Sequence, residues 1–264
     1  MPFREVRRVI YKKNPLDRVI CQLRFPPILK IDTEIPSEFQ DKIRKDFPNF
    51  LEKPGIEVEI PQNIKGKIPI EVLNQFFHRF ANKNYEFSSE DGQWQVNLTR
   101  TFLAFASKKY ERWEDFKSKL INSLMALIDV YNPSFFSRIG LRYIDVINRK
   151  VLGLGDVEWD ELLQPYILGL LSSPDIKERI QNFESKYEIN LLDDVSKVRL
   201  ITRFVIPSNT SEKCFMIDSD FNRSDKTNID EALNKLDYFN KRASRLIQWC
   251  ITDQLHQAME PYEV

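Results

Sequence analysis

Strict alternation of apolar and polar residues predicts several β-strands in the first half of the chain. Residues 18–25 alternate in this way and stop at two prolines, which cannot donate hydrogen bonds to a sheet. Residues 56–60 show the same pattern. The clearest pattern is a hairpin with a turn at Gly92, whose second strand is expected to run over 94–110. One face of that strand is expected to hold Trp94, Val96, Leu98, Phe102 and Ala104.

Helical spacing of apolar residues replaces this alternation after residue 112. It predicts a long helix from Trp113 to Tyr131, followed by a return strand over 136–149. Shorter helices are expected over 37–47, with Ser37 as N-cap, and over 70–80.

The second half repeats this order of elements. Three strands are expected over 183–191, 196–206 and 213–221, and a long helix over 229–258. The repeated order predicts an internal duplication. The fold class is therefore expected to be α+β, a mostly antiparallel sheet with long helices packed on one face.

Two prolines interrupt a predicted helical stretch in the middle of the chain, and this stretch marks the boundary between the two similar halves. The N-terminal half is expected over residues 1–150, a helical connector over 151–182 and the C-terminal half over 183–264. The length of 264 residues suits either one large domain or two small ones, and we expect one compact unit.

Composition and charge argue against several classes of protein. Lys plus Arg and Asp plus Glu both number 39, whereas a dedicated nucleic-acid binder usually has a basic excess. No signal peptide or membrane span is expected. The cysteines lack the spacing of a zinc or redox motif, so buried reduced thiols and a cytoplasmic location are expected for Cys21, Cys214 and Cys250.

Catalytic signatures are scarce in this sequence. Two histidines, His78 and His256, offer little for a hydrolytic triad, and no glycine-rich phosphate loop is present. The acidic stretch after Asp218 resembles a calcium loop but has Arg223 and Ile229 where that loop needs Gly and Glu. The sequence thus favours a protein that is not an enzyme and has no cofactor or metal.

Three predicted strands carry an arginine directly before an aromatic residue. If these strands are neighbours, Arg24, Arg142 and Arg203 would form a cationic ligand site framed by Asp145 and Asp218. A carboxylate, a phosphate or an RNA backbone would fit such a patch. The alternative is ordinary ion pairing across strands on an open sheet face.

Aromatic residues at the two ends of the predicted helix form a second candidate surface. If they are exposed, they mark a protein interface, and the alternative is packing in the core. This interface would consist of Tyr110, Trp113, Phe135 and Phe136.

Several segments resemble a known family. NPLDRVICQLRFPPILKI (14–31), YEFSSEDGQWQVNLTRTFLAFASKKYERWEDF (85–116) and RIGLRYIDVINR (138–149) are similar to a sporadically distributed bacterial family of uncharacterised proteins of about this length. The resemblance implies no settled activity. The patchy distribution of that family suggests a bacterial defence or toxin–antitoxin context.

Three functions follow in order of preference. The first is a non-catalytic module that binds a protein partner through an exposed apolar patch, without a deep polar pocket. The second is a nucleic-acid or nucleotide-binding protein that uses the arginine and aromatic residues of a sheet face. The third is a metal-dependent hydrolase in which Asp145, Asp218 and Asp220 converge.

Overall fold

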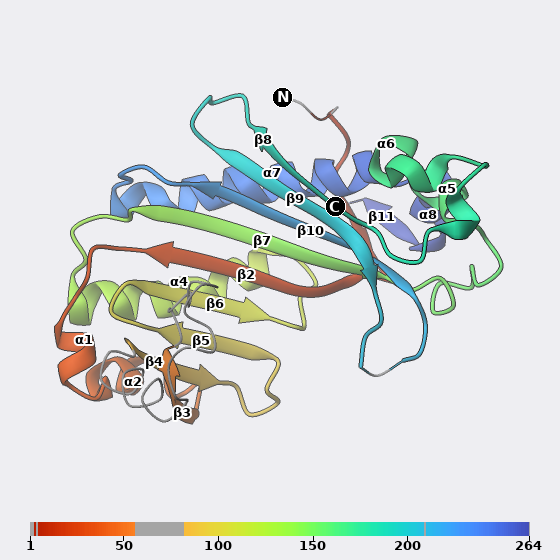
Figure 1. The fold of residues 1–264 in the computed structure, drawn as a ribbon. Coiled ribbons are helices and arrows are strands. Elements are labelled where there is room, and N and C mark those ends of the chain that lie inside the picture. The colour runs from red at the N-terminus through yellow and green to blue at the C-terminus, as the bar shows by residue number, and fades with distance from the viewer. Residues whose placement is uncertain (1–2, 4, 56–81, 209, 264) are drawn as a thin grey trace, which may run out of the picture.

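One antiparallel sheet of nine strands runs through both halves of the chain (Figure 1). The computed structural model describes residue 3 and residues 5–55, 82–208 and 210–263. In spatial order the strands are β3 (Asn49–Gly55), β4 (Asn82–Ser88), β5 (Trp94–Leu98), β6 (Phe102–Ser107), β2 (Leu16–Arg24), β7 (Arg138–Ile147), β10 (Cys214–Arg223), β9 (Lys197–Val205) and β8 (Glu184–Asn190). The predicted α+β class and antiparallel sheet are confirmed. The two halves share this sheet because β7 pairs with β10.

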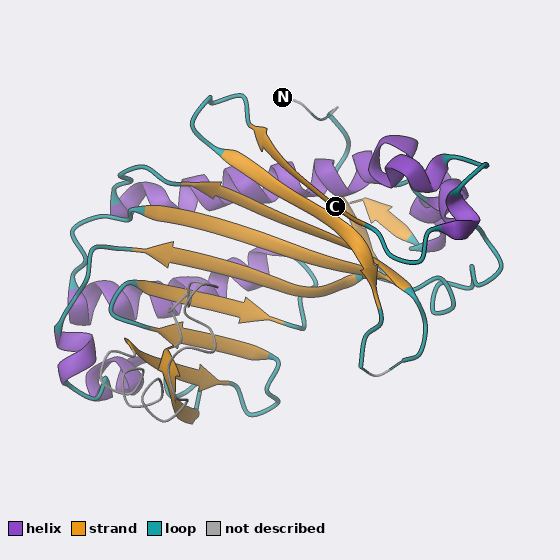
Figure 2. Cartoon of the chain, viewed as in Figure 1, coloured by secondary structure: helices purple, strands orange, loops and turns teal. Residues whose placement is uncertain are grey.

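The long helices pass behind strands of the sheet in the view of Figure 2, and the short helices lie beside its ends. The long helix α4 packs against β6, and the long helix α7 packs against β7 and β10. The helices are α1 (Lys30–Thr33), α2 (Ser37–Ile43), α4 (Trp113–Tyr131), α5 (Trp159–Leu162), α6 (Pro165–Leu168), α7 (Ala232–Cys250) and α8 (Asp253–Ala258). A separate two-stranded sheet pairs β1 (Val9–Tyr11) with β11 (Pro261–Glu263), so segments near the two chain ends lie together. Apolar periodicity does not reveal this pair, because each strand has only three residues.

The core lies between the sheet and the long helices. Because side chains alternate across a strand, every second residue of β6 is buried, and α4 packs against this strand. The fully buried rings of Phe105 on β6 and Phe116 on α4 pack edge to face, with centroids 5.0 Å apart. Aromatic contacts of this kind stabilise the sheet–helix interface beyond the burial of apolar area.

The predicted strand over 94–110 is two strands. Residues 94–98 form β5 and residues 102–107 form β6, with a tight turn between them. The Thr99 hydroxyl accepts hydrogen bonds from the backbone N–H groups of Thr101 (3.2 Å) and Phe102 (3.1 Å). The turn moves Leu103 and Phe105, not Phe102 and Ala104, onto the buried face. The error arose because the turn is made by a threonine side chain, without Gly or Pro.

Replacing Thr99 by valine is expected to destabilise the protein by about 1 to 2 kcal/mol, because the N–H groups of Thr101 and Phe102 lose the buried Thr99 hydroxyl as their acceptor. The matched control is Thr101→Val, which leaves the Thr99 acceptor in place and is expected to change little. Urea unfolding of both variants measures the difference. Equal effects of the two substitutions would contradict a capping function of Thr99.

The predicted helix over 229–258 is interrupted. α7 ends at Cys250, and Ile251 adopts an extended backbone that bridges to Leu163 of the connector. The Thr252 hydroxyl then caps α8 by accepting from Leu255 N–H. Apolar periodicity does not reveal this break, because Ile251 is as apolar as a helical core residue.

One of the two short helices predicted from the sequence lies among the described residues. α2 begins at Ser37, and its N-cap is Pro36, without a side-chain cap. The expected strand over 56–60, the expected helix over 70–80 and His78 lie outside the described residues. In the described part of the chain, no helix combines the length and the apolar character needed to span a membrane.

Candidate functional site

A cavity of about 510 Å³ lies between the sheet, the N-terminal segment and the two long helices. Alternation along β7 turns Tyr143 and Asp145 toward the helices, and Ser219 on β10 is the register partner of Tyr143. These three residues line the cavity from the sheet side. The segment around β1, the start of α4 and the middle of α7 line its other sides.

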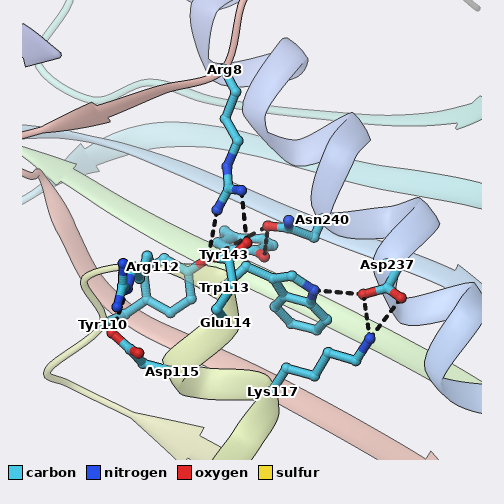
Figure 3. Close-up of polar contacts among 10 residues, drawn as sticks. All are labelled: Arg8, Tyr110, Arg112, Trp113, Glu114, Asp115, Lys117, Tyr143, Asp237 and Asn240. Carbon is cyan, nitrogen blue, oxygen red and sulfur yellow. Dashed lines mark hydrogen bonds and ion pairs between the residues drawn. The ribbon is translucent and has the colours of Figure 1, made fainter. Parts of the chain in front are cut away.

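Two tyrosines and an asparagine form a polar group in this cavity (Figure 3). The Tyr143 hydroxyl donates to Asn240 Oδ1 over 2.9 Å, and the Tyr110 hydroxyl approaches the same oxygen at 3.4 Å. Burial raises the pKa of Tyr110 to about 12 and that of Tyr143 well above its usual range. Both hydroxyls therefore stay protonated at neutral pH. The Nδ2 amide of Asn240 has no acceptor among the described residues and remains available to a ligand.

Ion pairs join the elements that surround the cavity. Asp237 on α7 accepts from the Trp113 indole N–H over 2.7 Å and from Lys117 Nζ over 2.7 Å, which links α7 to α4. Arg8 binds both carboxylate oxygens of Glu114 over 2.7 Å and lowers the pKa of Glu114 to about 2. Figure 3 shows Arg8 reaching α4 from the N-terminal segment. These two carboxylates already have partners within the protein.

Asp145 differs from these paired carboxylates. Its exposed fraction is 6%, and its carboxylate has no hydrogen-bond donor or ion-pair partner among the described residues. Burial raises the pKa of Asp145 to about 7, and the negative charge of Asp218 across the sheet adds to this. The neighbouring Tyr11 hydroxyl lies 2.8 Å from His256 Nδ1. The site therefore contains a buried acceptor that the protein itself does not satisfy.

The three predicted arginines occupy the opposite face of the sheet from this cavity. Arg24 is the register partner of Arg138 at one end of β7, whereas Arg203 lies level with Val146 near the other end. These two positions are eight residues apart along β7, which corresponds to a distance of roughly 26 Å. Arg142 lies between them. The structure thus does not bring Arg24, Arg142 and Arg203 together into one site.

Two of these arginines have carboxylate partners on neighbouring strands. Arg142 Nε donates to Asp218 Oδ1 over 2.7 Å, and Arg203 lies 3.6 Å from Glu184. The aromatic residues that follow them, Tyr143 and Phe204, point to the opposite face because side chains alternate along a strand. An arginine and its aromatic neighbour therefore cannot share one binding surface.

The predicted aromatic interface does not form one exposed patch. Phe136 is fully buried and Trp113 is 5% exposed. Tyr110 lines the cavity, and half-buried Phe135 has Lys226 Nζ 5.0 Å from its ring centroid. Most of these rings pack within the protein, which was the alternative interpretation of the sequence.

The three aspartates of the hydrolase hypothesis do not converge. Asp145 faces the helices, whereas Asp218 and Asp220 point to the other side of the sheet. Asp220 is bound by Arg138 (2.9 Å) and Arg199 (3.2 Å). In the described parts of the chain, no three potential metal ligands lie together. One metal ion cannot use all three aspartates.

One strand that lines this cavity carries a recognisable pattern in the sequence. Along β7, Ile139, Leu141, Tyr143 and Ile147 alternate on the buried face, and Asp145 occupies the same face. A charged residue at a core position is unusual and marks a candidate site. Asn240 and Tyr11 were missed, because nothing local in the sequence relates them to β7.

No protein-family model matches this chain, and no curated protein matches it significantly. The family resemblance inferred from the sequence therefore stays a prediction.

Proposed function

We propose that this protein is a non-catalytic binding module whose ligand occupies the cavity between the sheet and the long helices. The observation that carries this proposal is the Asp145 carboxylate, which is buried, lacks a partner among the described residues and borders a cavity of about 510 Å³. Cavities of roughly 300 to 1,000 Å³ with apolar walls and a few polar groups are typical of small-ligand sites.

The groups around the cavity favour binding over catalysis. Ser219 and Ser244 line it, and neither hydroxyl is hydrogen-bonded to a histidine in the described structure. His256 is engaged by the Tyr11 hydroxyl. Nucleophilic catalysis by serine needs an adjacent general base, which this arrangement does not supply.

The cavity changes the expected partner. A module that binds a protein through an exposed apolar patch is expected to lack a deep polar pocket, whereas this cavity has polar groups on several sides. A small molecule, or the end of a partner polypeptide, fits it better than a broad protein surface. The protein partner therefore remains within the proposal only if part of that partner enters the cavity.

Two aspects of the biological setting belong to the same proposal. A cytoplasmic location is supported by three cysteines that are all buried free thiols. A bacterial defence or toxin–antitoxin context rests on the family resemblance alone.

We also propose that the chain contains two similar halves with long helices on one face of the sheet. The order β4–β5–β6 followed by α4 corresponds to β8–β9–β10 followed by α7, and both helices have 19 residues.

Filling the cavity tests the proposed function. Ser244→Trp places an indole in the cavity from α7 and is expected to abolish ligand binding while the fold is retained. The control is Asn234→Trp, at an exposed position of the same helix that does not line the cavity. Binding is measured by isothermal titration calorimetry with tryptamine, tryptophol and indole-3-propionate, which share an indole and differ in charge.

The proposal expects at least one of these compounds to bind the wild type and the control but not Ser244→Trp. Circular dichroism of each variant establishes that the fold is intact. If no compound binds the wild type, or if binding persists in folded Ser244→Trp, the cavity is not the binding site for this class of ligand.

A further inference from the structure

We infer that the cavity recognises an organic ammonium ion, with Asp145 as its counter-ion. This inference rests on the proposed function, because it names the class of ligand that the same cavity takes. Asp145 would accept hydrogen bonds from the ammonium group, and the surrounding aromatic side chains would contact the body of the ligand.

Among the described residues, no neighbouring cation balances the charge of Asp145. The groups with which its carboxylate interacts are Tyr11 on β1, Tyr143 on its own strand, Cys250 on α7 and Asp218 on β10, and none of these is a cation. An isolated buried carboxylate is strongly disfavoured unless a positive partner is present. A cationic ligand would supply that partner.

The basic residues that line the cavity are engaged elsewhere or exposed. Arg8 is bound to Glu114, Arg112 to Asp115 and Arg245 to Glu5. Lys241 lies at an exposed position of α7. Among the described residues that line the cavity, none is therefore a cationic partner of Asp145.

Aromatic side chains also line the cavity. Tyr11, Tyr110, Tyr143 and Trp113 all border it, and the rings of Tyr110 and Tyr143 meet edge to face at 5.8 Å. Aromatic faces attract ammonium groups, and a nearby carboxylate strengthens this attraction. The same rings provide apolar area for the rest of the ligand.

The groups around Asp145 suit an organic cation better than a metal ion. Divalent metals need several oxygen, nitrogen or sulfur ligands at once, and the described residues contain no group of three potential ligands. A primary ammonium has three N–H donors and needs fewer charged partners. A ligand acceptor would also satisfy the free amide donors of Asn240.

Two sources of the ammonium group are compared, a free amine and the N-terminus of a polypeptide. Both present the same charged group to Asp145. Tryptamine represents the first source, and the peptide Trp-Gly-Gly represents the second. Its Nα-acetylated form, which lacks the charge, is the control for the peptide.

The experiment compares tryptamine with tryptophol and indole-3-propionate on the wild type, on Asp145→Asn and on Asp253→Asn. Asp253→Asn removes the same charge at an exposed position that does not line the cavity. Tryptamine is expected to bind the wild type at least about tenfold more tightly than tryptophol, and this preference should disappear in Asp145→Asn only.

The pH profile is a readout that a merely structural effect would not move. Below the pKa of Asp145, the carboxyl is neutral and its attraction for an ammonium is lost. Tryptamine affinity of the wild type should therefore rise by up to about tenfold per pH unit between pH 5.5 and 7, and Asp145→Asn should remove this rise. His256 contacts Tyr11 at the edge of the cavity, so His256→Gln is also measured to assign the effect.

The outcomes separate this inference from the proposed function. Equal or tighter binding of tryptophol or indole-3-propionate, lost in Ser244→Trp, would overturn the ammonium inference and leave the cavity as the binding site. Binding that is insensitive to Ser244→Trp would overturn both. A preference for Trp-Gly-Gly over its acetylated form would support the inference with a polypeptide N-terminus as the source, and a preference confined to tryptamine would support it with a free amine.

Discussion

Asp145→Asn is expected to make the protein more stable above pH 7, by about 2 to 4 kcal/mol in the absence of ligand. The cause is the buried carboxylate. Its pKa of about 7 in the folded protein compares with an ordinary value of 3.8. Ionising the carboxyl therefore destabilises the folded protein relative to the unfolded chain. Asparagine has nearly the same shape as aspartate and carries no charge.

The dependence of this effect on pH has a definite sign. Below about pH 4 the carboxyl is protonated in both states, and the substitution should change stability little. Between pH 4 and 7 the folded state binds the proton more tightly than the unfolded chain, so the wild type loses stability as the pH rises. Above pH 7 both states are ionised, and the difference between wild type and variant reaches a plateau.

Urea unfolding of the wild type and Asp145→Asn at half-unit steps from pH 4 to pH 8 measures this difference directly. Taking the difference removes the contributions of the other acids, which titrate in both proteins. Asp253→Asn, at an exposed position, is expected to show no such trend. A pH-independent difference for Asp145→Asn would mean that the carboxyl is not held protonated by burial.

Greater stability combined with lost ammonium binding would be the signature of a functional group. A purely structural aspartate would destabilise the protein when replaced, because its hydrogen bonds would be lost. Asp145 has no such bonds among the described residues. The two measurements on one variant therefore distinguish a binding residue from a structural one.

The sequence predicts the strands of this fold well where alternation is strict. On β7 the buried and half-buried positions alternate over most of ten residues, as the pattern indicated. It fails at Thr99 and at Ile251, where a side-chain hydrogen bond and a tertiary bridge decide the local structure. Such interactions override apolar periodicity and leave no trace in it.

The cavity lies largely beyond the reach of sequence analysis. Tyr143 and Asn240 are 97 residues apart and meet only because α7 packs on β7. The arginine patch failed for a related reason. The dipeptides Arg142-Tyr143 and Arg203-Phe204 suggested a shared surface, but alternation sends adjacent side chains to opposite faces. This rule excludes a surface shared by each arginine and its aromatic neighbour. The three arginines themselves lie on one face and are kept apart by their positions along the strands.

Removing the carboxylate of Asp220 is expected to cost about 2 to 3 kcal/mol of stability. Asp220 lies on the sheet face opposite the cavity, where its side chain is 8% exposed. It accepts hydrogen bonds from Arg138 and Arg199. Arg138 reaches it across Gly140, where any Cβ would collide with the guanidinium. Asp220→Asn therefore leaves two guanidinium groups on this face without their charged acceptor.

Glu188→Gln is the matched control, because Glu188 also pairs across strands of the same sheet. Its ion pair with Lys197 is exposed, with side-chain exposures of 61% and 47%. Exposed pairs of this kind contribute less than about 1 kcal/mol. The Asp220 effect should also persist in 1 M NaCl, since salt screens buried pairs weakly.

Urea unfolding of both variants at low and high salt measures these differences. A loss for Asp220→Asn no larger than that for Glu188→Gln would show that the arginines of this face are satisfied by water. In that case the guanidinium groups would be available to an anionic partner, and the nucleic-acid hypothesis would regain its physical basis. A loss of the expected size instead assigns Arg138 and Arg199 to holding the sheet together.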